Sequence, residues 1–165
     1  MAPTELGLGL GLVATLLVAT PGLGESTAAG SWQGPARECR VGGGGTERRG
    51  GCQSLRVDQR QAGVLSIRFL GGGDTNQVGR TTFAGILSGR PVALRCQQER
   101  CSLLMPINLK VSVVGEQHLL QGGDGQRAAR INAQVARGRC RISRRLVQCE
   151  ARGEGGRRWW GLARI

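Results

Sequence analysis

Hydrophobic and polar positions alternate most regularly in the middle of the chain. Over residues 107–113 every odd position is apolar and every even position polar, and residues 64–70 place Leu65, Ile67 and Phe69 on one side. Such alternation is typical of strands with one buried face. Several short strands at intervals of roughly ten residues predict a mainly β fold, a small antiparallel sandwich or barrel.

One segment shows a different periodicity. Residues 127–137 are rich in alanine, and Ala128, Ile131 and Val135 follow one another at the spacing of a helix face. Alanine is the strongest helix former, and this spacing favours one apolar helix side. The segment therefore predicts a short amphipathic helix.

The first residues are almost entirely apolar. Residues 6–19 form an uncharged run of the length of a secretory h-region, and small residues suited to cleavage follow at Gly24 and, at the latest, Gly30. We expect residues 1–24 to be a signal peptide and the protein to be secreted and extracellular; a buried apolar helix is the alternative. No later segment reaches the roughly 18 apolar residues of a membrane span, so no transmembrane segment is expected.

Glycine dominates the ends of the chain. Of the 165 residues 29 are glycine, and aromatic residues make up only 3%. Glycine loses the most backbone freedom on folding, so such a chain needs cross-links or accepts flexible ends. We expect a flexible glycine-rich leader at 25–51, a disulfide-stabilised β domain at 52–149, and a basic, tryptophan-containing tail at 150–165.

Six cysteines could supply the cross-links. They form three neighbouring pairs: Cys39 and Cys52, Cys96 and Cys101, and Cys140 and Cys149. Six cysteines allow fifteen connectivities, but two of these pairs flank predicted turns, which favours pairing between neighbours. The competing interpretation, a zinc site, lacks the usual Cys-x2-Cys spacing and has one histidine available, so neither a metal nor another cofactor is expected.

Residues suited to catalysis are sparse. A nucleophile needs a base within hydrogen-bond reach, most often histidine, and His118 is the only one in the chain. The acidic residues are dispersed in predicted loops, and no phosphate-binding or dinucleotide-binding glycine motif is present. The sequence therefore favours a non-enzymatic protein, with a secreted enzyme of unknown class as the weaker alternative.

Basic residues are the strongest functional signal. The formal net charge is +12, and residues 126–165 contain eleven arginines against Glu150 and Glu154. Arginine suits bidentate contact with sulfate, carboxylate or phosphate, although a GC-rich gene would also give abundant arginine and little lysine. Around the predicted hairpin 140–149 the candidate polyanion-binding residues are Arg137, Arg139, Arg141, Arg144 and Arg145.

Outside the cell the matching partners are sulfated glycosaminoglycans or another acidic cell-surface component, together with an unknown protein receptor; nucleic acid is not expected. The sequence thus predicts a secreted binding protein, a ligand or extracellular modulator. Its alternative is the precursor of a peptide, cut at the dibasic pairs 48–49, 144–145 and 157–158.

Overall fold

The computed structural model describes residues 29–43, 46–71, 78–98, 100–121 and 127–165. The predicted signal peptide at 1–24 lies outside this range. Within the range, no helix is long and apolar enough to cross a membrane.

Antiparallel strands make up nearly all of the described chain, which confirms the mainly β prediction. The strands are β1 (Gly30–Pro35), β2 (Arg37–Gly43), β3 (Thr46–Gly51), β4 (Ser54–Gln61), β5 (Val64–Leu70), β6 (Val78–Ser88), β7 (Leu94–Gln97), β8 (Arg100–Leu103), β9 (Ile107–Gln121), β10 (Arg127–Ile142), β11 (Leu146–Gly153) and β12 (Arg158–Arg164). Among the described residues, one 3-10 turn, η1 (Glu154–Gly156), precedes β12.

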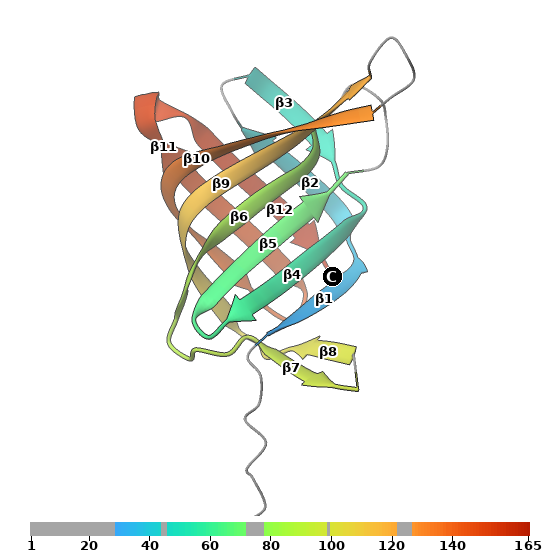
Figure 1. Cartoon of the computed structure of the whole chain (residues 1–165), viewed down its shortest axis with the longest axis vertical. Helices are drawn as coiled ribbons and strands as arrows, with labels where there is room; N and C mark the ends of the chain where they lie inside the picture. Colours follow the sequence, from blue (N-terminus) through green and yellow to red (C-terminus); the bar gives the residue numbers. More distant parts are fainter. Residues whose placement is uncertain (1–28, 44–45, 72–77, 99, 122–126) are drawn as a thin grey trace, which may run out of the picture.

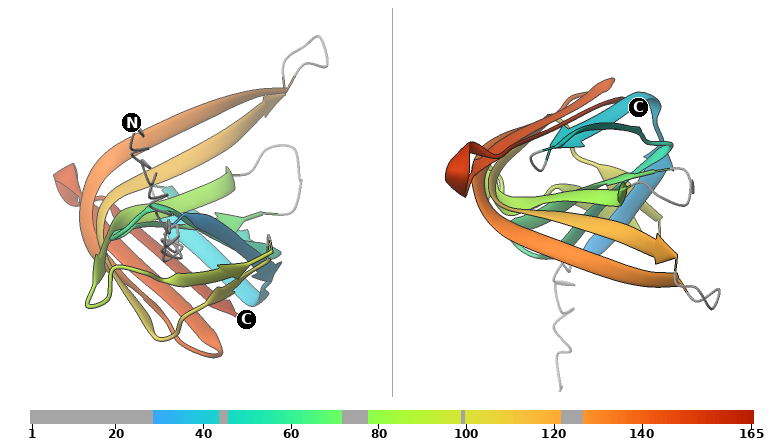
Figure 2. Two further views of the ribbon diagram at one scale, coloured as in Figure 1. Left: turned by 60° about the horizontal axis from the view of Figure 1, so that its bottom comes forward. Right: turned by 90° about the horizontal axis from the view of Figure 1, so that it is seen from above.

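Ten of these strands form one sheet that curves into a nearly closed barrel (Figures 1 and 2). The strand order is β1-β4-β5-β6-β9-β10-β11-β12-β2-β3. β1 and β2 follow each other directly in the chain, separated only by Ala36, yet β1 pairs with β4 and β2 with β12. The N-terminal strands therefore connect the two ends of the curved sheet, and of the two predicted architectures the barrel is the one formed.

Side chains fill the interior of the barrel. The largest fully buried residues are Trp159, Phe69, Phe83, Leu55, Leu65, Ile67, Leu109, Ile142 and Gln59. Phe69 and Phe83 meet edge to face with ring centroids 5.8 Å apart. A Cβ atom on Gly161 of β12 would lie 2.6 Å from the Phe69 ring of β5. The ring therefore reaches across the interior and packs against the opposite wall.

A separate two-stranded hairpin, β7–β8, lies at one end of the barrel (Figure 1). Buried Gln59 holds the segment 91–93, which leads into β7 of this hairpin. Its side-chain Nε2 donates to the carbonyl of Pro91 at 2.7 Å, and its Oε1 accepts from the backbone N–H of Ala93 at 2.8 Å. One amide side chain thus satisfies two backbone groups that would otherwise lie unpaired at the end of the core.

All three predicted disulfides are present, each between neighbours. Cys140 and Cys149 are directly opposite each other on β10 and β11, and both are buried in the barrel. Cys96 and Cys101 hold together the β7–β8 hairpin, and Cys39 and Cys52 join the chain at the two ends of the β2–β3 hairpin. The prediction of a disulfide-pinned hairpin at 140–149 is confirmed.

The predicted helix at 127–137 is wrong, because these residues belong to β10. This strand pairs with β9 along one edge and with β11 along the other. Residues four apart share a face in a strand as well as in a helix, so the spacing of Ile131 and Val135 does not distinguish the two. Both side chains lie on the outer face, 70% and 71% exposed. Pairing with two neighbouring strands outweighs the helix propensity of alanine.

The predicted flexible ends are also corrected. The leader 25–51 contains β1, β2 and β3, and its buried Cys39 and Val41 belong to the core. Gly43, inside the glycine run, adopts φ 144°, a conformation that residues with a side chain rarely take. The tail 150–165 contains the end of β11 and all of β12, in which buried Trp159 and Ala163 alternate with exposed residues. Both ends complete the barrel.

Candidate polyanion-binding surface

Strand alternation places three of the predicted arginines on the outer face of β10. Ala136, Cys140 and Ile142 point into the core. Arg137, Arg139 and Arg141, at the intervening positions, are exposed. At about 3.4 Å per residue, their Cα atoms extend over about 14 Å of the strand.

Two arginines that the sequence analysis did not select join this face. Arg137 of β10 lies directly opposite Arg152 of β11, and Arg152 lies directly opposite Arg158 of β12. We call these three exposed residues the arginine row. Neighbouring strands are about 4.8 Å apart, so the row spans about 10 Å across three strands. Like charges directly opposite each other destabilise a sheet, and a multiply charged anion would remove that repulsion.

Acidic side chains on this wall are already paired. Glu150 of β11 accepts an ion pair from Arg139 at 2.8 Å, and Glu38 of β2 accepts one from Arg164 at 2.8 Å. These are the only carboxylates on the described parts of β2, β10, β11 and β12. None of the ion pairs among the described residues involves an arginine of the row, so the row keeps its positive charge.

A depression of about 440 Å³ adjoins the row. Its lining residues are Arg137, Gly138, Arg139, Glu150, Ala151, Arg152, Arg158, Trp159 and Trp160. Trp160 is 36% exposed, and a Cβ atom on Gly42 would lie 2.9 Å from three atoms of its indole ring. The missing side chain at Gly42 therefore lets the ring lie close against β2. The depression combines four guanidinium groups with an aromatic edge.

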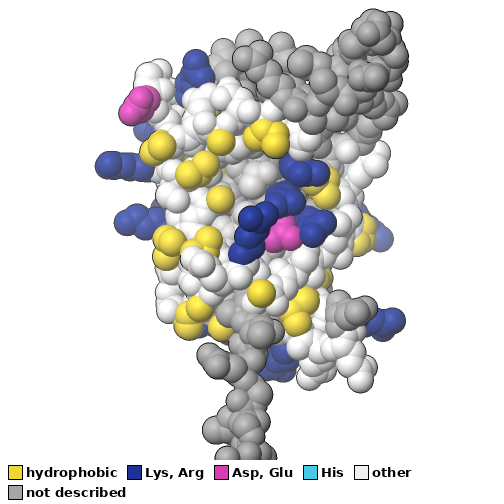
Figure 3. All heavy atoms as spheres, in the orientation of Figure 1, with side chains coloured by type: hydrophobic (Ala, Val, Ile, Leu, Met, Phe, Trp, Pro, Cys, Tyr) yellow, Lys and Arg dark blue, Asp and Glu magenta, His cyan; other side chains and the backbone are white. Residues whose placement is uncertain are grey.

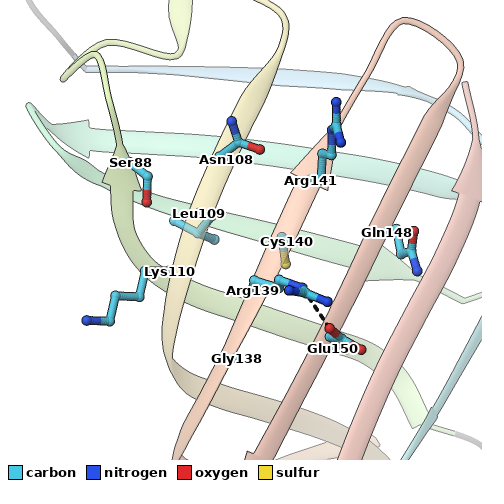
Figure 4. A pocket seen from close by; sticks show the side chains of 10 residues that line it. All are labelled: Ser88, Asn108, Leu109, Lys110, Gly138, Arg139, Cys140, Arg141, Gln148 and Glu150. Carbon is cyan, nitrogen blue, oxygen red and sulfur yellow. Dashed lines mark ion pairs between the residues drawn. The ribbon is translucent and has the colours of Figure 1, made fainter.

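A second, larger depression of about 620 Å³ continues along the sheet (Figure 4). It shares Gly138, Arg139 and Glu150 with the first. Figure 4 shows the Arg139–Glu150 ion pair within it, with Arg141 and Gln148 further along the same strands. The basic face thus extends beyond the arginine row toward β9.

Arg144 and Arg145 lie apart from the row. They are exposed in the turn between β10 and β11, which Ser143 fixes by donating its N–H to the carbonyl of Leu146 at 2.8 Å. The strand from Arg137 to Ile142 alone covers about 17 Å. The structure therefore divides the predicted set into three arginines on the sheet and two at the hairpin tip.

The residues that were missed could be found in part from the sequence. If Cys140 and Cys149 face each other, antiparallel register places Arg137 opposite Arg152. Arg158 required recognition of the last strand, where Arg158, Trp160 and Leu162 alternate with Trp159, Gly161 and Ala163. That alternation is visible in the sequence, but the glycines at 153, 155 and 156 that precede it are more typical of a flexible tail.

Neither a metal site among the described residues nor a similarity to known proteins indicates a function. Within the described ranges, no three His, Cys, Asp or Glu side chains gather closely enough to hold a metal ion. Comparison of the chain with protein-family models, curated proteins and solved structures gives no match. Function must therefore be inferred from the residues themselves.

Proposed function

We propose that the protein is a secreted, non-enzymatic binding protein that holds sulfated glycosaminoglycans on the outer face of β10, β11 and β12. The observation that carries this proposal is the arginine row. Three guanidinium groups lie side by side, and the carboxylate nearest to them in the adjoining depression, Glu150, is paired with Arg139; Trp160 also lines this depression.

The chemistry of the row suits a sulfated chain. A guanidinium group presents donors in a planar fork that matches the oxygens of sulfate, and charge-assisted hydrogen bonds of this kind are among the strongest in proteins. The arginines lie on paired strands of a nearly closed sheet, so binding orders side chains but little backbone. Each contact releases counterions from the polyanion, so the affinity should fall steeply as salt rises.

Heparin chromatography tests the proposal with two variants of equal charge. The row variant is Arg137→Gln, Arg152→Gln and Arg158→Gln. The control variant is Arg60→Gln, Arg95→Gln and Arg100→Gln, three exposed arginines of β4, β7 and β8. We expect the wild type and the control to elute well above physiological salt and the row variant much earlier. Equal elution of the two variants would refute the row as the binding site.

Proteolytic maturation at dibasic pairs is the second candidate. Its supporting observation is that Arg144 and Arg145 are exposed in a turn, where a protease has access. Cleavage there would leave the two sides joined by the Cys140–Cys149 disulfide, and cleavage after Arg158 would detach a core strand. Intact mass of the secreted product, before and after reduction, separates the candidates: a single chain favours binding, and fragments ending at Arg145 or Arg158 favour the precursor.

A further inference from the structure

We propose that the outer face of β4, β5 and β6 carries a second anion site, which takes a sulfate or phosphate monoester group. It consists of Arg56, Arg68 and Arg80 around Asp58. It lies on the opposite wall of the barrel from the arginine row and does not depend on it.

The three arginines converge from neighbouring strands. Arg56 of β4 lies directly opposite Arg68 of β5, and Arg80 of β6 lies opposite Leu70, diagonal to Arg68. Direct neighbours in a sheet have Cβ atoms about 4.5–5.5 Å apart and diagonal neighbours about 7–8 Å apart, so one anion can contact all three guanidinium groups. Figure 3 shows basic side chains gathered around an acidic one on the wall formed by these strands.

Asp58 acts as a positioning residue. Its Oδ1 accepts a hydrogen bond from Arg56 Nε at 2.8 Å, and its side chain is only 11% exposed. Its Oδ2 lies 3.4 Å from Arg68 Nε, an ion pair without a hydrogen bond among the described residues. A carboxylate that engages Nε leaves the two terminal nitrogens of each arginine for another acceptor. Asp58 therefore fixes the Arg56 guanidinium group by a hydrogen bond and draws the Arg68 guanidinium group toward it by charge attraction before a ligand arrives, which lowers the entropy cost of binding.

Arg80 provides an independent sign of a missing acceptor. Its Nε is buried and has no hydrogen-bond partner in the described part of the protein. Buried donors of this kind are rare, since leaving one unpaired is costly, and a charged donor more so. With three arginines and one carboxylate, the cluster also keeps excess positive charge. A bound oxyanion would satisfy the Arg80 donor and neutralise part of that excess.

The two sites face away from each other. Phe69 of β5 packs across the interior against Gly161 of β12. Successive residues of a strand point to opposite faces. Arg68, next to Phe69, and Trp160, next to Gly161, therefore point outward. Their strands, β5 and β12, lie on opposite walls of the barrel (Figure 1). One protein molecule could bind two polyanion chains and link them together.

Titration calorimetry with two small probes tests the second site. The probes are sucrose octasulfate and inositol hexakisphosphate, which distinguish sulfate from phosphate as the preferred group. We expect about two probe molecules per wild-type protein. The row variant, whose substitutions are all on the exposed outer face, should retain about one. Binding of either probe to the row variant supports the site, and its complete loss there overturns it.

A further substitution localises the remaining binding. Arg80→Gln, added to the row variant, should weaken the affinity by roughly tenfold, the effect of removing one charge-assisted contact. Asp58 keeps both of its partners in this variant, and thermal unfolding checks that the barrel is intact. Unchanged affinity would refute the site. The outcomes are separable from the proposed function, which fails instead when heparin retention does not depend on the arginine row.

Discussion

Two consecutive tryptophans allow a matched test of the barrel interior. Trp159 is 2% exposed and Trp160 is 36% exposed, because they point to opposite faces of β12. Changing each to alanine removes the same side chain from neighbouring positions. The two variants therefore differ only in which face of the strand loses its indole ring.

The expected loss for Trp159→Ala follows from its surroundings. Replacing a buried tryptophan by alanine costs about 3–5 kcal/mol in unfolding free energy. The Trp159 Nε1 is buried without a hydrogen-bond partner among the described residues, and removing this unpaired donor should recover about 1 kcal/mol. We therefore expect a net loss of about 2–4 kcal/mol for Trp159→Ala. Trp160→Ala, on the solvent side, should cost less than about 1.5 kcal/mol.

Urea denaturation and thermal unfolding measure these losses. For a chain of this size, the loss at Trp159 corresponds to a Tm lowered by roughly 5–15 °C. The denaturant midpoint should fall with little change in its slope, provided that unfolding stays two-state. Equal losses at the two positions, or a larger loss at Trp160, would contradict the assignment of Trp159 to the core.

Three further predictions concern single contacts and the arginine row. Gly161→Ala should lower the unfolding free energy by about 1–3 kcal/mol in urea denaturation, because its methyl group would press on the Phe69 ring; an unchanged midpoint would contradict that packing. Glu150→Gln frees Arg139 and should raise the salt concentration at which heparin releases the protein; earlier release would contradict it. In the row variant, the slope of log Kd against log salt concentration should fall by roughly three, one for each lost contact. The control variant should keep the wild-type slope.

The strands were predictable where alternation was strict and flanked by turns. Residues 64–70 and the first part of β9 both show a buried and an exposed side in the sequence, and both are strands. The Cys140–Cys149 hairpin could be predicted because two cysteines enclosed a short polar turn. In these segments local pattern and tertiary pairing agree.

The N-terminal strands could not be predicted, and the last strand only from its short alternation, because the burial of both ends depends on distant partners. Gly42 is buried because Trp160 covers it, and Gly161 because Phe69 reaches it from the opposite wall. A glycine-rich segment has no side-chain pattern from which such contacts could be predicted. The candidate site could not be predicted in full for the same reason, because it depends on strand pairing. Arg158 lies near Arg137 only because β12 pairs with β11 and β11 pairs with β10.

Arginine-selective modification, read by mass spectrometry, tests the central claim most directly. The folded protein is treated with phenylglyoxal in the presence and absence of a heparin hexasaccharide, and the modified arginines are identified after digestion. We predict that the hexasaccharide protects Arg137, Arg152 and Arg158, while exposed Arg95 and Arg100 of the β7–β8 hairpin react equally in both samples. Protection of Arg95 and Arg100, with the arginine row left reactive, would contradict the assignment of the binding surface to β10, β11 and β12.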